Sequence, residues 1–242
     1  MPSVTPHLSR QRRDTFSRKG RRTNEISEAL RILKQGGIVA YPTDTAYGLA
    51  VDATNARAVR KLYRLKGRNF HNPIHVIPPT KIWINKLVKL TPAAKRLIDQ
   101  LMPGPLTLVL PLKASGASWQ LLSAGTQTLG IRRPKHKLAL DLAMGLGKPI
   151  TTTSANLSGR PNVYSVSELK QQLPQHIYGH IYALDGGRLP RTKPSTVVSL
   201  VDPTPGPSPG QGRGVLSGKT SNHAKILRPG PISETQINKV LG

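Results

Sequence analysis

Short apolar runs typical of buried strands alternate with helical patterns through most of the chain, and this mixture strongly restricts the fold. Ile38–Tyr41, Leu106–Leu112 and Thr128–Arg132 are apolar and β-branched enough to form strands. Between them, residues 91–101 show the apolar spacing of a helix that Thr91-Pro92 opens. Such mixing predicts an α/β fold, and 242 residues can form one large core. We therefore predict a single α/β domain over residues 23–242.

Two segments do not fit this pattern. Residues 1–22 hold seven Lys or Arg between positions 10 and 22 against one acid, Asp14, and show no apolar periodicity. We predict a disordered basic arm there, although its composition also resembles an organelle transit peptide. Residues 203–222 include the run PTPGPSPGQGRG. Because Pro and Gly at this density cannot bury a core, this stretch is predicted to be a flexible insertion.

The charge of the chain favours a polyanionic partner. Lys and Arg number 36 against 11 Asp and Glu, a formal charge of +25, and nucleic acid is the commonest partner for such a surface. An acidic membrane would also attract it, but no long apolar run is present, so we expect a soluble, cytoplasmic protein without a membrane partner. The chain has no cysteine and its seven His residues lack ligand spacing, which argues against a metal held by the protein.

The stretch Pro149–Asn162, PITTTSANLSGRPN, crowds hydroxyl and amide groups behind a short β-branched run. Such groups bind phosphate without adding charge, but they also form ordinary strand-to-helix turns, which is the commoner role of an isolated stretch. The usual phosphate-binding glycine patterns and the G-x-S-x-G elbow are absent. With so few carboxylates, paired-acid catalysis is not expected either.

Cations are the other groups that could carry chemistry. Lys66 and Arg68 stand at a predicted helix end beside Asn72, while Arg132 ends a predicted strand and Arg228 follows another. Taken alone, each of these cations is most simply explained as a solvated surface charge, or as a charge that complements a helix dipole. Together they predict a site that stabilises anions such as a triphosphate or a carboxylate, without a nucleophile of its own.

Seven segments of the chain form a recognisable series. They are YPTDTAYGLA (41–50), KGR with NP (66–73), PGPLTLVL (103–110), TLGIRRP (128–134), TTSANLSGRPN (152–162), DGG with STVV (185–198) and ILRPG (226–230). In this order they resemble the YrdC family of threonylcarbamoyl-adenylate synthases, also called TsaC. The resemblance covers about residues 23–232.

The resemblance implies a fold and an activity. The fold would be a twisted, open mixed sheet with flanking helices around a basic concave cavity. The activity would be a nucleotidyl transfer that joins L-threonine, bicarbonate and ATP into threonylcarbamoyl-adenylate and releases pyrophosphate, with Mg²⁺ held mainly by the ATP phosphates. Partner proteins would use the product to modify tRNA, and tRNA itself is a candidate partner.

The resemblance also implies site residues, none of them a metal ligand. The catalytic tetrad would be Lys66, Arg68, Ser154 and Asn156. The ATP site would be formed by Arg68, Asn72, Thr128, Ser154, Asn162 and Arg228. The L-threonine site would be formed by Thr45, Arg132, Thr152 and Ser195.

Two features depart from the family pattern. Ile77 stands where many members place a His near the threonine, and we expect His75 to lie on the other strand face and not to replace it. The insertion separates STVV from ILRPG, so Arg228 reaches the site only if the chain folds back. Two alternatives stay open: an RNA-binding protein of the same fold without activity, and a carbamoyl-transfer or YciO-like relative.

Overall fold

The computed structural model describes residues 22–203 and 216–242. The predicted basic arm up to residue 21 and the centre of the predicted insertion lie outside the described residues. Residue 22, at the predicted end of the arm, already lies in a helix over residues 22–34. The bounds 1–22 and 23–242 for arm and domain stay a prediction.

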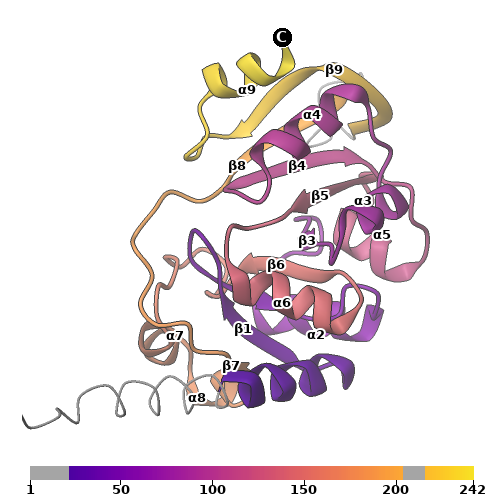
Figure 1. The fold of residues 1–242 in the computed structure, drawn as a ribbon. Helices are drawn as coiled ribbons and strands as arrows, with labels where there is room; N and C mark the ends of the chain where they lie inside the picture. The colour runs from indigo at the N-terminus through magenta and orange to yellow at the C-terminus, as the bar shows by residue number, and fades with distance from the viewer. Residues whose placement is uncertain (1–21, 204–215) are drawn as a thin grey trace, which may run out of the picture.

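One mixed, open sheet forms the centre of the described part of the chain (Figure 1). The strand order is β7-β1-β2-β6-β3-β5-β4-β8-β9. Three neighbouring pairs are parallel, namely β1 with β7, β3 with β5 and β4 with β8, and the other pairs are antiparallel. The strands are β1 Ile38–Pro42, β2 Tyr47–Ala50, β3 His75–Ile77, β4 Leu106–Pro111, β5 Thr128–Arg132, β6 Ile150–Ser154, β7 Ile181–Ala183, β8 Thr196–Pro203 and β9 Leu216–Arg228.

Helices cover the two faces of the sheet unequally. Besides residues 22–34, the helices are α2 Ala56–Leu65, α3 Lys81–Leu87, α4 Pro92–Leu101, α5 Ala117–Ser123, α6 Lys137–Leu146, α7 Val166–Gln172, α8 Gln175–Tyr178 and α9 Glu234–Leu241. The larger core joins α2, α4, α5 and α9 to one side of the sheet, through residues such as Leu62, Leu97 and Leu108. The smaller core joins helix 22–34 and α6 to β1, β3 and β6. The predicted α/β class with flanking helices is confirmed.

The smaller core occupies only part of its face, and this leaves room for a site. Ile77 of β3 and Ile150 of β6 are buried in that core. Side chains two positions apart on a strand point to the same face, so His75 and Thr152 continue this face beyond the two helices. Along β3 and β6, the part of the face that the two helices cover is therefore apolar, and the part beyond them carries polar side chains.

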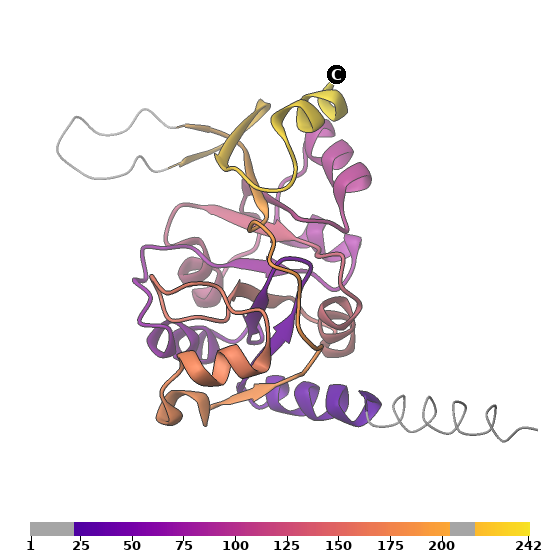
Figure 2. The ribbon, with the colours of Figure 1, turned by 90° about the vertical axis from the view of Figure 1, so that its left-hand side faces the viewer.

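The segment between β7 and β8 closes the side of this uncovered region. Both ribbon views show residues 184–195 running along the molecule from β7, at one edge of the sheet, to β8, next to the other edge (Figures 1 and 2). On the way, the Thr192 hydroxyl donates a hydrogen bond of 3.1 Å to the Thr45 carbonyl. This path places Ser195 close to the turn between β1 and β2.

The structure differs from the sequence prediction in two places. The helices α3, α5 and α8 were not expected, and they are short, with only four to seven residues each. Residues 216–222, predicted as part of a flexible insertion, belong to β9, which pairs antiparallel with β8. Backbone hydrogen bonds to β8 extend β9 through residues without an apolar pattern, so the composition of these residues did not predict a strand.

Candidate functional site

A cavity of about 160 Å³ opens on the uncovered part of the sheet face. It is bounded by the turn between β1 and β2, by β3, β5 and β6, and by the chain before β8 and at the end of β9. Eight of the predicted site residues line it: Thr45, Arg68, Arg132, Thr152, Ser154, Asn162, Ser195 and Arg228. The structure therefore brings together side chains that lie up to 183 residues apart in the chain.

The cavity is strongly basic. Three arginines line it, Arg68, Arg132 and Arg228, and none of the described lining residues is Asp or Glu. Burial lowers the pKa of Arg68, and burial followed by the charge of Arg132 lowers the pKa of Arg228. Partly buried cations in a cavity without acidic lining residues attract anions more strongly than cations in bulk water, since the local dielectric is lower. The predicted basic concave cavity is confirmed.

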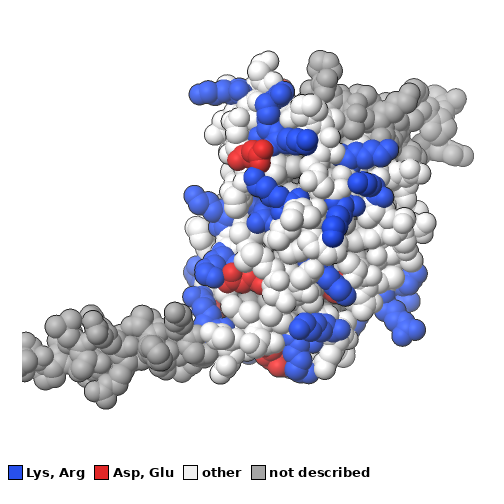
Figure 3. Space-filling model, turned by 45° about the vertical axis from the view of Figure 1, so that its right-hand side comes forward, with Lys and Arg blue, Asp and Glu red and all other residues white. Residues whose placement is uncertain are grey.

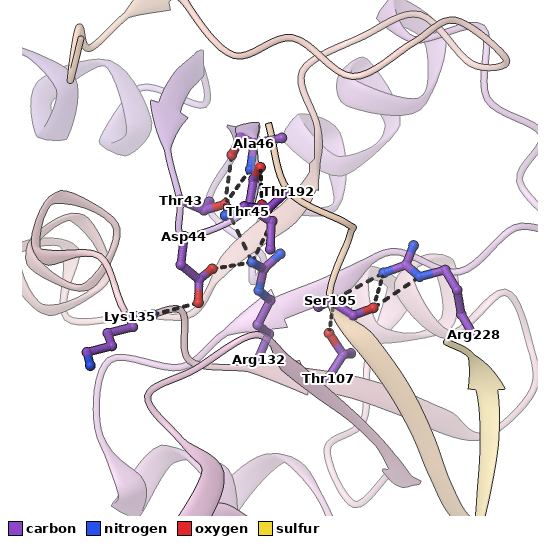
Figure 4. Close-up of polar contacts among 10 residues, drawn as sticks. All are labelled: Thr43, Asp44, Thr45, Ala46, Thr107, Arg132, Lys135, Thr192, Ser195 and Arg228. Carbon is purple, nitrogen blue, oxygen red and sulfur yellow. Dashed lines mark hydrogen bonds and ion pairs between the residues drawn. The ribbon is translucent and has the colours of Figure 1, made fainter. Parts of the chain in front are cut away.

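Arg132 is held from the turn between β1 and β2 (Figure 4). Its Nη2 donates to the Asp44 carboxylate and, at 2.8 Å, to the Thr45 hydroxyl. The Thr43 hydroxyl organises this turn, because it donates to the Ala46 carbonyl at 2.7 Å and accepts from the backbone N–H of Thr45 at 3.2 Å. A cation at the end of β5 thus has a fixed place in the cavity wall.

Arg228 and Ser195 form a second polar cluster on the opposite side of the close-up (Figure 4). Arg228 Nη2 donates to the Ser195 carbonyl at 2.9 Å and to its hydroxyl at 3.0 Å. The Ser195 hydroxyl also lies 2.9 Å from the Thr107 hydroxyl. Pairing of Val197 with Arg228 brings β9 back to β8, so Arg228 reaches the site despite the insertion. A residue predicted for ATP, Arg228, thus contacts one predicted for L-threonine, Ser195; both roles stay predictions.

Lys66 and Asn156 lie behind the cavity wall and do not line it. The Lys66 ammonium donates to the Ser154 carbonyl, to the Asn156 carbonyl at 2.5 Å and to the Asn156 side-chain oxygen at 3.3 Å. Burial, and then the charge of Arg68, lower the pKa of Lys66 to about 7. Hydrogen bonds connect three members of the predicted tetrad, Lys66, Ser154 and Asn156, and the Lys66 ammonium is directed at the 154–156 turn. The catalytic role of the tetrad stays a prediction.

His75 is a lining residue that the sequence prediction placed on the wrong face. Because His75 and Ile77 are two positions apart on β3, they share a face. Ile77 is buried in the smaller core, whereas His75 lines the cavity, and its ring packs over Gly130 of β5. Burial, followed by the charges of Arg228, Arg68 and Arg132, lowers the pKa of His75 to about 3, so its imidazole is neutral at physiological pH.

Two further predicted residues stand outside the cavity lining. The Asn72 carbonyl accepts hydrogen bonds from Arg68 Nε at 3.2 Å and from the Tyr63 hydroxyl at 2.9 Å, so Asn72 supports Arg68. Thr128, at the start of β5, is buried with its hydroxyl 2.8 Å from that of Thr126. The roles of Asn72 and Thr128 in ATP binding stay predictions. Thr43 and Thr153 line the cavity and were missed, although each lies in a motif already singled out.

The described residues contain no group of three or more His, Cys, Asp or Glu that could hold a metal ion. No helix in them is long and apolar enough to span a membrane.

A family model places this arrangement among known proteins. The Sua5/YciO/YrdC model, described as "Telomere recombination", matches residues 31–207, which is most of the chain. The chain belongs to the Sua5/YciO/YrdC family.

Proteins of this family with synthase names are similar to the chain over most of its length. The threonylcarbamoyl-AMP synthase of Bacillus subtilis is 37% identical over 224 residues, which cover 90% of this chain and 57% of that protein. A putative threonylcarbamoyl-AMP synthase of Mycobacterium tuberculosis strain H37Rv is 34% identical over 222 residues, which cover 91% of this chain and 91% of that protein. The chain thus spans little more than half of the Bacillus relative and nearly all of the mycobacterial one.

Solved structures of the family have the same fold. Sua5 of P. abyssi, crystallised with L-threonine, superposes with a TM-score of 0.74 at 31% identity, covering 90% of this chain and 57% of that chain. YciO of E. coli superposes with a TM-score of 0.69 over 88% of this chain and 92% of that one; at 23% identity it supports the fold alone.

Proposed function

We propose that the protein is an L-threonylcarbamoyladenylate synthase, a nucleotidyltransferase that condenses L-threonine, bicarbonate and ATP and releases pyrophosphate. The observation that carries this proposal is the cavity in which Arg132 stands among hydroxyls while Arg68 and Arg228 supply further cations. The synthase names of the relatives and the L-threonine complex of the Sua5 structure support it.

L-Threonine is proposed to bind at Arg132. A guanidinium recognises a carboxylate through charge-assisted hydrogen bonds, and the hydroxyls of Thr45, Thr152 and Ser195 offer partners for the remaining polar groups. A cavity of about 160 Å³ is smaller than the roughly 300–1,000 Å³ of pockets for drug-sized ligands, which suits an amino acid. The nucleotide would then extend into the open mouth.

The phosphates of ATP are proposed to lie at Arg68, Arg228, Ser154 and Asn162. In the reaction, the threonine amine attacks bicarbonate to form a carbamate with loss of water. A carbamate oxygen then attacks the α-phosphorus and displaces pyrophosphate. Negative charge builds on phosphate oxygens, so fixed cations and hydroxyls that bind the transition state more tightly than the substrates would accelerate this step.

Mg²⁺ is proposed to enter with the nucleotide. The polar side chains of the described lining are cations, hydroxyls, one amide and one neutral imidazole, a set that suits phosphate oxygens better than a divalent cation. Bound by the phosphates, the ion would neutralise part of their charge. The residues of the chain would position the three substrates and exclude water from between them.

The partners of the reaction product are also proposals. Proteins that transfer the threonylcarbamoyl group to tRNA would consume the adenylate, and tRNA could contact the basic surface directly. On the face shown in Figure 3, Lys and Arg side chains spread over the surface with few acidic ones among them. A cytoplasmic location stays a prediction.

One observation favours a second candidate, an RNA-binding protein of this fold without activity. The helix α2 exposes Arg57, Arg60 and Lys61, and the whole chain carries a formal charge of +25. Contacts with phosphates supply most of the non-specific affinity for nucleic acid. This candidate predicts RNA binding without turnover of ATP. A carbamoyl-transfer or YciO-like activity likewise predicts no threonine-dependent pyrophosphate release.

Pyrophosphate release tests the proposal. The purified chain is incubated with ATP, Mg²⁺ and bicarbonate, with and without L-threonine, alongside Arg132→Ala and Lys66→Ala. Arg57→Ala, which removes an exposed cation outside the cavity, is the matched control. We expect threonine-dependent release from the wild type and the control, and a loss of at least tenfold in the two site variants. Folded wild-type protein without threonine-dependent release would reject the synthase.

A further inference from the structure

We propose that Asp44 is a positioning residue that holds the Arg132 guanidinium ready for the carboxylate of the amino-acid substrate. This inference rests on the proposed function and deepens it. The Asp44 carboxylate stands directly beside a site that is proposed to bind another carboxylate. Asp44 must therefore either repel the ligand or act through a group that binds it.

The environment of Asp44 favours the second role. Its side chain is 11% exposed and that of Arg132 is 10% exposed, so the ion pair is nearly buried. One Asp44 oxygen accepts from Arg132 Nη2, and the other accepts from the backbone N–H of Lys135 at 2.9 Å. Asp44 is not among the residues that line the cavity, whereas Arg132 is. Its charge is thus neutralised behind the arginine.

Arg132 keeps hydrogen-bonding capacity for a ligand. Its hydrogen bonds to described residues all leave from Nη2, toward Asp44, Thr45 and Thr43. Its Nε is buried and has no partner among the described residues. The Nη1 group likewise makes no hydrogen bond to the described residues, so a carboxylate in the cavity would find charge-assisted donors on that side of the guanidinium. The observed arrangement anchors one edge of the group and leaves donors free.

Asp44 also joins two parts of the wall that are distant in sequence. It belongs to the turn after β1, while Lys135 belongs to the connection between β5 and α6 (Figure 4). Because the carboxylate contacts both, it fixes the guanidinium relative to the turn that carries Thr45. A long arginine side chain loses rotamer freedom when it binds a ligand, and a preformed ion pair removes that loss from the binding step.

The test measures L-threonine binding to the full chain by calorimetry, and the kinetics of pyrophosphate release, for wild type and Asp44→Asn. Asn keeps the size of the side chain but removes its charge. Loss of a charge-assisted hydrogen bond predicts a Kd and a KM for threonine about 10- to 100-fold higher. The rate at saturating threonine and the KM for ATP should change less than threefold, which a general loss of structure would not produce.

Two comparisons separate positioning from other effects. In an Arg132→Gln background, Asp44→Asn should change the Kd for threonine less than twofold, because the group through which it acts is gone. Asp99→Asn removes a carboxylate from an exposed ion pair with Lys81 outside the cavity and should leave the Kd within twofold. If Asp44→Asn does not fold, Asp44→Glu keeps the charge but misplaces it and should raise the Kd at least fivefold.

The outcomes are distinct. Failure of the folded wild type to bind threonine would overturn the proposed function and this inference with it. Normal threonine binding by wild type and by Asp44→Asn alike would overturn the role of Asp44 and leave the proposed function standing. An equal effect of Asp44→Asn with and without Arg132 would show that Asp44 does not act through the arginine.

Discussion

Lys66 makes the folding stability of this protein depend on pH in a direction that can be worked out. The residue is 2% exposed, and burial followed by the charge of Arg68 lowers its pKa from 10.5 to about 7. The unfolded chain keeps the proton up to about pH 10.5, whereas the folded chain loses it near pH 7. The unfolded state therefore binds more protons in this window, and the free energy of unfolding rises with pH.

The size of this effect follows from the two pKa values. One proton contributes a slope of at most about 1.4 kcal/mol per pH unit, and integration gives about 2 kcal/mol between pH 7 and 9. Below pH 7 both states hold the proton, so the full cost of burying the ammonium is present and stability changes little. The same deprotonation should lower activity, because a neutral amine has two N–H groups for three acceptors on the 154–156 turn.

The assay is denaturant unfolding of wild type and Lys66→Met between pH 6 and 9. Met has a similar length but does not titrate, so the difference between the two proteins isolates Lys66 from all other groups. We expect the wild type to gain about 2 kcal/mol relative to the variant from pH 7 to 9, while its pyrophosphate release declines. A difference that stays flat over this range would show that Lys66 remains charged and would refute the reasoning.

Three more predictions concern the cavity wall. Gly130→Ala would place a methyl group 2.2 Å from the His75 ring, so we expect about 1–3 kcal/mol of destabilisation by thermal unfolding and weaker threonine binding; an unchanged Tm and Kd would contradict this. His75→Gln should leave the shape of the pH–rate profile between pH 5 and 8 unchanged, since the pKa of His75 is about 3; a shifted profile would mean that His75 titrates there. Ser195→Ala removes a hydroxyl that accepts a hydrogen bond from Arg228. It should raise the KM for both ATP and threonine about 10-fold, which corresponds to a loss of about 1–2 kcal/mol in binding. An effect on the KM of one substrate alone would show that the two sites are separate.

Much of the fold could be predicted because local burial is visible in the sequence. β5 was predicted with its observed bounds, and β1, β4 and α4 to within one residue. Each is dominated by apolar or β-branched residues, or has a helical apolar stripe. The short helix α5 is different: Trp119 and Leu122 are buried in the larger core, to which α2 also contributes, so tertiary packing stabilises it more than its own pattern does.

The types of chemical group at the site were also determined by sequence. Motif residues supplied the cations and hydroxyls, and eight predicted residues line one cavity. Face alternation on β3 was equally a matter of sequence, since His75 and Ile77 must point the same way once both belong to one strand. The prediction that the two side chains point to opposite faces was therefore wrong, although the sequence contains the information needed to predict the correct face.

What only the tertiary structure decided is which of these groups reach the ligand space. Lys66 and Arg68 are two residues apart, yet Gly67 between them has φ +56°, and the first turns toward the 154–156 carbonyls while the second lines the cavity. Helix 22–34 and α6 cover Ile77 but leave His75 open, although both share one strand face. Sequence determines the chemistry and the local face of each side chain. Exposure depends on contacts between residues far apart in the chain, and these exist only when the sheet has assembled.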